Sequence, residues 1–174
     1  MMEKFLPDMY QKDIYSVNYD KLKNKDIKLL VFDFDNTIVD KKGLNPDKKL
    51  IAFFQKLKKS FNVIVISNTL KSEKIVNFCT KCDLKFVRKA LKPLKSGYKR
   101  INKEQKYESS SVAAIGDQLL TDIWGAKRMG YFTILVDPIG IDDTSFTKIN
   151  RIVEVRLYQK LKQKFNFEKG KYYD

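Results

Sequence analysis

The segment Leu29-Leu30-Val31-Phe32-Asp33-Phe34-Asp35-Asn36-Thr37 combines a short apolar run with two carboxylates. An apolar run of this length is typical of a strand buried on both faces in a parallel sheet. In extended geometry Asp33 and Asp35 leave the same face of that strand. Two like charges at short range raise each other's pKa unless a cation lies between them. The segment therefore predicts a strand ending in a divalent-metal site; the alternative is a buried strand that runs into an ordinary polar turn.

Further strands and helices alternate along the rest of the chain. Apolar runs at residues 62–66, 86–87, 112–115 and 133–136 predict four more strands. Helices are expected from Asn45-Pro46 (N-cap and first residue), from Ser72, near 95–103 and 122–129, and over 144–164. This alternation predicts an α/β fold with a doubly wound parallel sheet and helices on both of its faces. The segment from Thr37 to Ser67 is too short to hold a large cap domain.

The chain divides into three parts by composition. Residues 27–165 carry the alternating pattern and form the expected catalytic domain. Residues 1–26 are rich in aromatic and apolar residues of mixed periodicity, and we expect them to pack on this domain or to form a contact surface. Residues 166–174 are expected to form a mobile tail.

Composition excludes several classes of site. The chain has no histidine, which excludes histidine-nucleophile phosphatases, Ser-His-Asp hydrolases and His-ligated zinc. Acid–base chemistry must then rest on carboxylates, Lys, Tyr or Cys. Cys79 and Cys82 are the two cysteines, too few for a structural zinc site. We expect both to be buried for packing.

The charge distribution indicates anionic partners. Net charge is +14, and residues 61–110 alone hold twelve Lys or Arg against four Asp or Glu. Such a field attracts phosphorylated substrates, anionic lipid surfaces or nucleic acid; the alternative is that these lysines only solvate the surface. Nucleic acid is the less favoured partner, because no basic and aromatic binding motif is evident. No run reaches membrane-spanning length and no signal-peptide core is present, which favours a cytoplasmic location. The sequence does not indicate an oligomeric state.

Polar residues follow the predicted strands at the edge where α/β sheets bind ligands. Asp33 can attack phosphorus and form an aspartyl-phosphate. Asp35 can protonate the leaving oxygen and later activate water. Lys92 supplies a fixed positive charge beside the transferring group and holds the nucleophile. Mg²⁺ is the expected metal.

The remaining site residues divide into ligands of the metal and ligands of the phosphoryl group. The expected metal ligands are Asp33, Asp35 and Asp117, with Asp122 as an indirect, water-mediated partner. The expected substrate-binding residues are Asn36, Thr37, Ser67, Asn68 and Lys92, together with backbone N–H groups of residues 34–36 and 68.

Four motifs of the haloacid dehalogenase (HAD) superfamily have similar counterparts in this chain, in the same order. They are Asp33-Phe34-Asp35-Asn36-Thr37, Ser67-Asn68, Lys92-Pro93 and Gly116-Asp117-Gln118-Leu119-Leu120-Thr121-Asp122. The last motif, with Phe5-Leu6-Pro7-Asp8 and Thr133-Ile134-Leu135-Val136, resembles the YqeG-type, class IIIA phosphatases. The resemblance implies the Rossmann-like fold, Mg²⁺ and the roles given above.

Relatives of this group dephosphorylate phosphatidylglycerophosphate to phosphatidylglycerol, so the resemblance also implies a lipid substrate. A lipid phosphate would require peripheral contact with the inner face of an anionic membrane. Phe5, Leu6, Tyr10, Tyr15 and Tyr19 and the basic segments are candidates for this contact; the alternative is that the aromatic residues belong to the core. A HAD phosphatase of a small soluble ester remains the other hypothesis for the substrate. A phospho-accepting receiver domain is disfavoured because the third predicted strand ends without a carboxylate.

Overall fold

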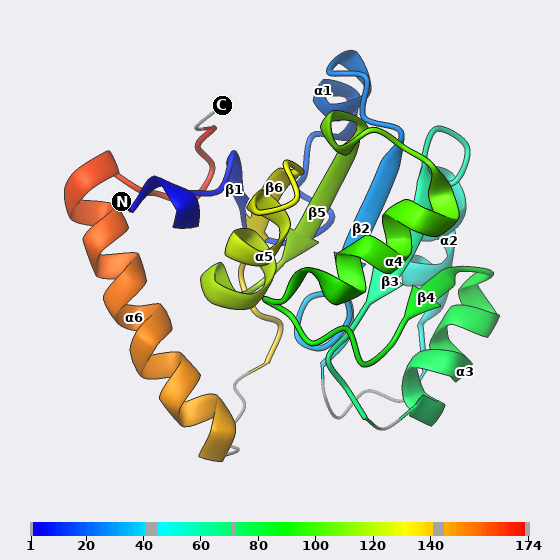
Figure 1. The fold of residues 1–174 in the computed structure, drawn as a ribbon. Helices are drawn as coiled ribbons and strands as arrows, with labels where there is room; N and C mark the ends of the chain where they lie inside the picture. Colours follow the sequence, from blue (N-terminus) through cyan, green and yellow to red (C-terminus); the bar gives the residue numbers. More distant parts are fainter. Residues whose placement is uncertain (1, 41–44, 71, 141–144, 173–174) are drawn as a thin grey trace.

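A single parallel sheet of six strands forms the centre of the protein (Figure 1). The computed structural model describes residues 2–40, 45–70, 72–140 and 145–172. The strands, in the spatial order β1-β6-β5-β2-β3-β4, are β1 (Met9–Gln11), β6 (Phe132–Val136), β5 (Val112–Gly116), β2 (Leu29–Asp33), β3 (Asn62–Ile66) and β4 (Lys85–Val87). The predicted α/β fold with a doubly wound sheet is confirmed.

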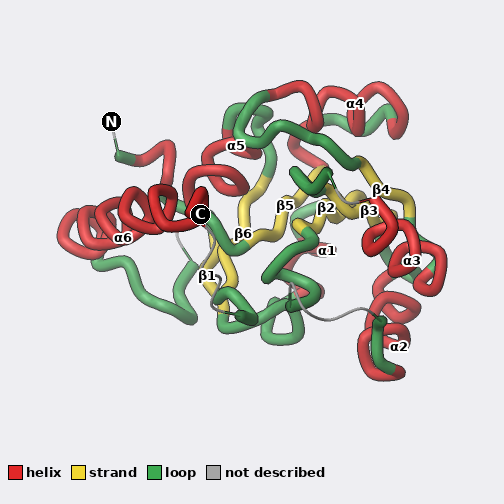
Figure 2. Tube along the Cα trace, turned by 90° about the horizontal axis from the view of Figure 1, so that it is seen from below, coloured by secondary structure: helices red, strands yellow, loops and turns green. Residues whose placement is uncertain are grey.

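Helices cover both faces of the sheet (Figure 2). On one face lie α1 (Tyr19–Asn24), α2 (Lys48–Leu57) and α3 (Ser72–Cys82). On the other lie α4 (Lys95–Gln105) and the short α5 (Trp124–Lys127), while α6 (Ser145–Phe165) packs near the β1 edge. Residues of β2 alternate between the two cores: Leu30 and Phe32 face the α2 side, and Leu29 and Val31 face the α4 side. This two-sided burial explains the continuous apolar run that opens the segment.

The strand order reverses direction between β2 and β5. From β2 the chain proceeds outward through β3 and β4, then returns to pair β5 on the opposite side of β2. The carboxyl ends of strands at such a reversal leave a crevice in which α/β proteins bind ligands. Asp33 ends β2 and Asp117 directly follows β5, so the topology brings two of the predicted site residues together. In the described part of the chain, the segment between β2 and β3 holds α2 and no cap domain.

The N-terminal segment contributes a strand that the sequence pattern did not reveal. β1 pairs in parallel with β6, with Met9 opposite Ile134. Asp8 fixes this edge, because its carboxylate accepts hydrogen bonds from Thr133 N and Oγ1, both at 2.7 Å. Three residues with mixed periodicity carry too little pattern to be recognised as a strand.

The C-terminal residues 166–172 lie against β1, whereas the sequence suggested a mobile tail. Phe167 is fully buried and stacks on Tyr10 with ring centroids 5.0 Å apart. Tyr10 N donates to the Lys171 carbonyl oxygen at 3.0 Å, and Gly170 N donates to the Tyr10 carbonyl oxygen at 2.7 Å. One aromatic anchor and two backbone hydrogen bonds hold this terminal segment in the structure. Residues 173–174 lie outside the described residues.

Two predicted helix starts differ from the structure. The N-cap of α2 is Asp47, whose Oδ1 accepts from Leu50 N at 2.7 Å; Asn45 instead accepts side-chain hydrogen bonds from Asn77 and Lys81. Asp and Asn are comparable N-caps, so the sequence alone did not separate them. The helix expected at 122–129 begins earlier, as a π-helical turn η3 (Leu119–Ile123) that leads into α5.

Two smaller expectations concern α3 and α6. Cys79 and Cys82 are both buried on α3 and form no disulfide, as expected for packing residues. The sequence predicts that the final helix begins at Thr144, which lies outside the described residues. The described part of this helix, α6, begins at Ser145. Among the helices that the structure describes, none is both long enough and apolar enough to cross a bilayer.

Candidate active site

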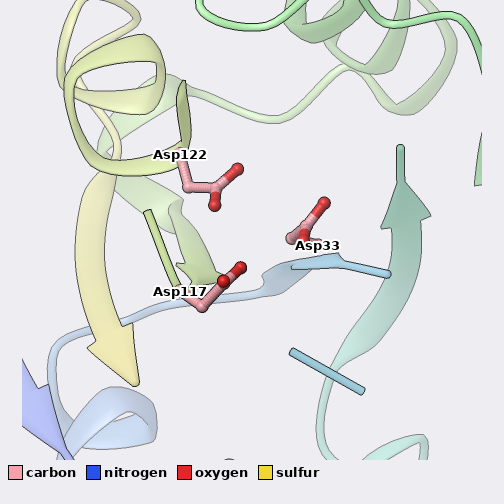
Figure 3. Close-up of side chains that lie close together, drawn as sticks. All are labelled: Asp33, Asp117 and Asp122. Carbon is pink, nitrogen blue, oxygen red and sulfur yellow. The ribbon is translucent and has the colours of Figure 1, made fainter. Parts of the chain in front are cut away.

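Three carboxylates and one lysine form a group at the strand reversal, called here the inner cluster. It consists of Asp33, Lys92 and Asp122, which are buried, and of Asp117, which is half-buried. Oxygen atoms of the three aspartates lie within 4.8 Å of one another (Figure 3). Lys92 Nζ donates to Asp33 Oδ1 and, at 2.6 Å, to Asp122 Oδ1. The group is assembled from the ends of β2 and β5, the turn η3 and the loop after β4.

The inner cluster holds more negative charge than its lysine neutralises. Burial raises the pKa of Asp33 to about 7 against the opposing effect of Lys92. Burial, followed by the charges of Asp33 and Asp122, raises the pKa of Asp117 well above its usual range. Burial alone would lower the pKa of Lys92, but Asp122 and Asp33 outweigh it and keep the lysine charged. A cation placed among these carboxylates would relieve their repulsion.

The donor set fits a hard divalent cation. All three candidate ligands are carboxylates, which suit Mg²⁺ or a similar ion. With all three ionised, Lys92 leaves a net charge of about −2 for such an ion to balance. Asp122 lies within the carboxylate set, whereas the sequence suggested an indirect, water-mediated role for it.

Thr37 and Asn36 connect the loops around the inner cluster. Thr37 Oγ1 donates to Asp117 Oδ1 at 3.0 Å and lies 3.4 Å from Asp33 Oδ2. Asn36 has a positive φ of 65°, which Asn tolerates better than most residues. Its N–H donates to the Val39 carbonyl oxygen and its own carbonyl oxygen accepts from Ile139 N, both at 2.8 Å. The Asn36 N–H is thus engaged within the loop, and the predicted substrate contacts of Asn36 and Thr37 stay predictions.

A second set of polar residues, the outer group, consists of Asp35, Ser67 and Asn68. Ser67 Oγ donates to Asp35 Oδ2 at 3.1 Å and accepts from Thr69 N at 3.0 Å. Asp35 is half-buried and stands outside the set of three carboxylates. β2 ends at Asp33, and Asp35 forms an isolated parallel bridge with Val39. Its predicted role as a metal ligand stays a prediction.

Asn68 binds the backbone of Lys92 at two points. Asn68 Nδ2 donates to the Lys92 carbonyl oxygen at 3.0 Å, and Asn68 Oδ1 accepts from Lys92 N at 2.7 Å. Both ends of its amide are therefore used to fix the residue whose ammonium group contacts Asp33. In this conformation Asn68 orients Lys92; its predicted contact with a phosphoryl group stays a prediction.

Three residues that the sequence analysis did not single out shape the loop that carries Asp117 and Asp122. A side chain at Gly116 would place its Cβ 2.5 Å from the Asp122 carboxyl carbon, so only glycine admits Asp122 at this position. Tyr98 Oη lies 3.4 Å from the carbonyl oxygens of Thr121 and Asp122. Glu154 of α6 accepts hydrogen bonds from Leu119 N and Leu120 N. The Gly-Asp dipeptide is a local sequence signal for the role of Gly116. Nothing local in the sequence indicates the roles of Tyr98 and Glu154.

Comparison with known proteins places the chain among phosphatases. The family model described as mitochondrial PGP phosphatase matches residues 2–140. The probable phosphatase YqeG of Bacillus subtilis (strain 168) is 36% identical over 166 residues, which cover 94% of this chain and 96% of that protein. The chloroplastic/mitochondrial phosphatidylglycerophosphate phosphatase 1 of Arabidopsis thaliana is 25% identical over 150 residues, covering 81% of this chain and 43% of that protein.

A solved structure shows the same architecture. It is that of a putative 3-deoxy-D-manno-octulosonate 8-phosphate phosphatase from Vibrio cholerae, with a TM-score of 0.53 at 12% identity. The match covers 85% of this chain and 93% of that one. At this identity the likeness concerns the fold, which is HAD-like.

Proposed function

Because the chain belongs to the PGP phosphatase family and is a HAD-like phosphoric monoester hydrolase, we propose that it hydrolyses phosphatidylglycerophosphate to phosphatidylglycerol through an aspartyl-phosphate on Asp33. The observation that carries the chemistry is the contact of Asp33 Oδ1 with the buried ammonium group of Lys92, among three clustered carboxylates. Mg²⁺, held by Asp33, Asp117 and Asp122, would supply positive charge that stabilises the transferring phosphoryl group.

In the first half of the reaction the carboxylate of Asp33 is the nucleophile. Lys92 engages Oδ1 and so orients Oδ2 as the attacking oxygen. A bond forms between this oxygen and phosphorus, while the bond from phosphorus to the glycerol oxygen breaks. Asp35 donates its proton to that leaving oxygen, which departs as an alcohol. Ser67, hydrogen-bonded to Asp35 Oδ2 at 3.1 Å, holds the acid in place.

In the second half of the reaction water attacks phosphorus. Asp35, now a carboxylate, accepts a proton from this water as the new oxygen–phosphorus bond forms. The bond between phosphorus and Asp33 breaks, which releases inorganic phosphate and restores the Asp33 carboxylate. Asp35 is again protonated, and atoms and charge balance over the cycle.

Three observations support a lipid substrate at a membrane surface. The family description and the Arabidopsis relative both carry the name of this phosphatase. The chain is strongly basic, with a net charge of +14. Exposed aliphatic side chains follow β3, β4 and β6 at the same edge of the sheet as the inner cluster: Leu70 (75% exposed), Leu91 (59%) and Ile139 (53%). An apolar edge next to an active site suits contact with a bilayer.

The N-terminal aromatic residues are less suited to membrane contact than the sequence suggested. Tyr10 is buried, and Tyr19 packs on Phe53 and donates to the Ile14 carbonyl oxygen. Phe5 lies against Trp124, with ring centroids 5.7 Å apart. We therefore place the proposed membrane contact at the edge formed by Leu70, Leu91 and Ile139, while Tyr15, which is 41% exposed, stays a candidate from the N-terminal segment.

The substrate is tested by comparing phosphatidylglycerophosphate in anionic vesicles with a panel of soluble phosphate esters, measuring phosphate release with Mg²⁺. We expect kcat/KM for the lipid to exceed that for every soluble ester by at least about 100-fold, a difference of roughly 2.7 kcal/mol in transition-state binding. Equal or better turnover of a soluble ester would replace the lipid with a small substrate. No turnover of any ester would reject the phosphatase mechanism.

Membrane contact is tested separately by vesicle co-sedimentation. The protein should pellet with anionic vesicles at low salt and less at high salt, because salt screens the lysines. Replacing Leu70 and Ile139 by Ser should weaken binding, whereas Tyr172→Ser should not, since Tyr172 pairs with Met9 at the start of β1 and not at the carboxyl ends of the strands. Binding that is equal for all variants would remove the proposed edge from the contact.

A further inference from the structure

The turn η3 that connects Asp117 to Asp122 is held from outside by one carboxylate. The first N–H groups of a helical turn have no partner inside that turn. Glu154 Oε2 accepts from Leu119 N at 2.8 Å, and Glu154 Oε1 accepts from Leu120 N at 2.7 Å. Glu154 thus caps η3 from α6, more than thirty residues further along the chain. It is also the only acidic residue in the span Ser145–Phe165.

Apolar contacts already explain why α6 packs where it does. Leu161 is fully buried in a cluster with Leu119 and Ile123, and Leu157 and Tyr158 pack against the same cluster. Glu154, by contrast, is a carboxylate that burial disfavours: burial raises its pKa to about 7, although the N–H groups of Leu120 and Leu119 oppose this. Glu154 is half-buried, and partial removal of a carboxylate from water is unfavourable unless its hydrogen bonds compensate. The specific contribution of Glu154 to the structure is therefore its two hydrogen bonds with the backbone of η3.

The geometry of η3 sets the spacing of two carboxylates in the inner cluster. Asp117 precedes the turn and Asp122 lies within it. Asp122 Oδ1 accepts a hydrogen bond from Lys92 Nζ at 2.6 Å, and Asp122 Oδ2 accepts one from Gln118 N at 3.1 Å. Each oxygen of the Asp122 carboxylate therefore has its own partner. A π-helical turn is wider and rarer than an α-helical one. Hydrogen bonds from a residue outside η3 would therefore help to stabilise this turn between the two candidate metal ligands.

We propose that Glu154 is a positioning residue, which keeps Asp117 and Asp122 at the spacing that a divalent cation requires. It acts through the backbone of Leu119 and Leu120 and touches neither the cation nor the reacting atoms. This inference rests on the proposed function, since it takes these carboxylates to be the metal ligands. The matched family model ends at residue 140, so α6 supplies this element from outside the region that the family match covers.

The experiment compares Glu154→Ala and Glu154→Gln with Glu168→Gln. The last variant makes the same chemical change at an exposed carboxylate of the C-terminal segment, paired with Lys171 at 2.9 Å. Trp124 is the only tryptophan in the chain and directly follows η3, so its fluorescence reports a Mg²⁺ titration without turnover. The rate of amide hydrogen exchange in a peptide covering residues 117–124 reports the stability of η3 in the metal-free protein.

We expect Glu154→Ala to weaken Mg²⁺ binding by about 10- to 100-fold, the range seen for residues that orient metal ligands. The rate of amide hydrogen exchange in residues 117–124 should rise in the same variant. Glu154→Gln retains one acceptor oxygen and should fall between Glu154→Ala and wild type. Lost turnover should recover in part at high Mg²⁺, and Glu168→Gln should match wild type in every measurement.

Two outcomes overturn the inference. One is a folded Glu154→Ala protein that equals Glu168→Gln in Mg²⁺ affinity and in exchange of 117–124. The other, which decides the matter if Glu154→Ala does not fold, is a Glu154→Gln protein that equals wild type in both. Absence of turnover in the wild-type protein would instead reject the proposed function, while exchange in the metal-free protein would still decide the role of Glu154.

Discussion

The inner cluster and the outer group lie at the same edge of the sheet but are stabilised in different ways. In the inner cluster, Asp33, Asp122 and Lys92 are buried and bound by ion pairs. In the outer group, Asp35 is half-buried and Asn68 is exposed, and both are fixed by ordinary hydrogen bonds. Buried charges depend on counter-charge, whereas a half-exposed carboxylate can exchange protons with solvent. The inner cluster is therefore suited to holding a cation and a nucleophile, and the outer group to proton transfer.

The largest expected effect removes the nucleophile from the inner cluster. Asp33→Asn should lower kcat by at least about three orders of magnitude, because no covalent intermediate can form. The fold should persist, since the amide is nearly isosteric and Lys92 keeps Asp122 as a partner. Phosphate release and a thermal melt measure the two effects. Wild-type turnover in this variant would refute the nucleophile assignment.

A change in the outer group should affect one half of the reaction more than the other. Asp35→Asn should slow turnover by about 10²- to 10⁴-fold, the usual contribution of a general acid–base residue. With an ester that has a good leaving group, the aspartyl-phosphate should still form and then accumulate, since the attacking water has lost its base. Acid quenching with a radiolabelled ester measures it. If the trapped phosphoenzyme never exceeds the wild-type level, Asp35 does not have this role.

The pH dependence of stability should distinguish the inner cluster in the metal-free protein. The pKa of Asp33 is about 7 in the folded chain, against an ordinary value of 3.8. Between these values the folded state binds more protons than the unfolded state, so the free energy of unfolding should fall as pH rises from about 4 through 7. The expected loss is on the order of 4 kcal/mol, since one unit of pKa corresponds to about 1.4 kcal/mol. Urea unfolding in EDTA at several pH values measures it. Asp33→Asn should reduce the slope of the curve, while Asp117 and Glu154, whose pKa values are also raised, keep contributing to it; an equal slope in that variant would contradict this assignment.

The smallest effect on activity is expected away from both groups. Replacing Cys79 and Cys82 together by Ala removes two buried thiols from α3. We expect unchanged kcat and a loss of about 1–2 kcal/mol in stability from the small cavities left behind. Activity assays and urea unfolding measure these changes. Stoichiometric zinc in the wild-type protein, or inactivation by oxidation that requires these two residues, would contradict a packing role.

Most of the polar residues at the carboxyl edge of the sheet could be predicted, because the sequence patterns that indicate them are local. Each strand there is a short apolar run, and the polar residue that ends it is read directly from the next position, as with Asp33, Ser67 and Asp117. Lys92 was predictable because it follows the third predicted strand. The sheet order then brings these residues together without further information.

The contacts that orient these residues were not predictable for physical reasons. Asp35 accepts a hydrogen bond from Ser67, which lies 32 positions further along the chain. The pairing of Asn68 with Lys92 and of Glu154 with η3 spans 24 to 35 positions and rests on side-chain geometry. β1 and the segment after α6 stabilise each other, so neither carries a complete signal alone. Sequence patterns report burial along one element, whereas these contacts join separate elements.

The position of β1 has a consequence for the order in which the protein assembles during synthesis. β1 emerges from the ribosome before the other five strands of the sheet, yet its sheet partner β6 lies more than 120 residues later, and Phe167 and Lys171 later still. The central strands β2, β3 and β5 can associate before that point, while residues 9–11 wait without a partner. An edge strand in this state can pair with other chains. Chains halted before residue 132 should therefore be the species that chaperones must protect, and completion of β6 is the step that ends this exposure.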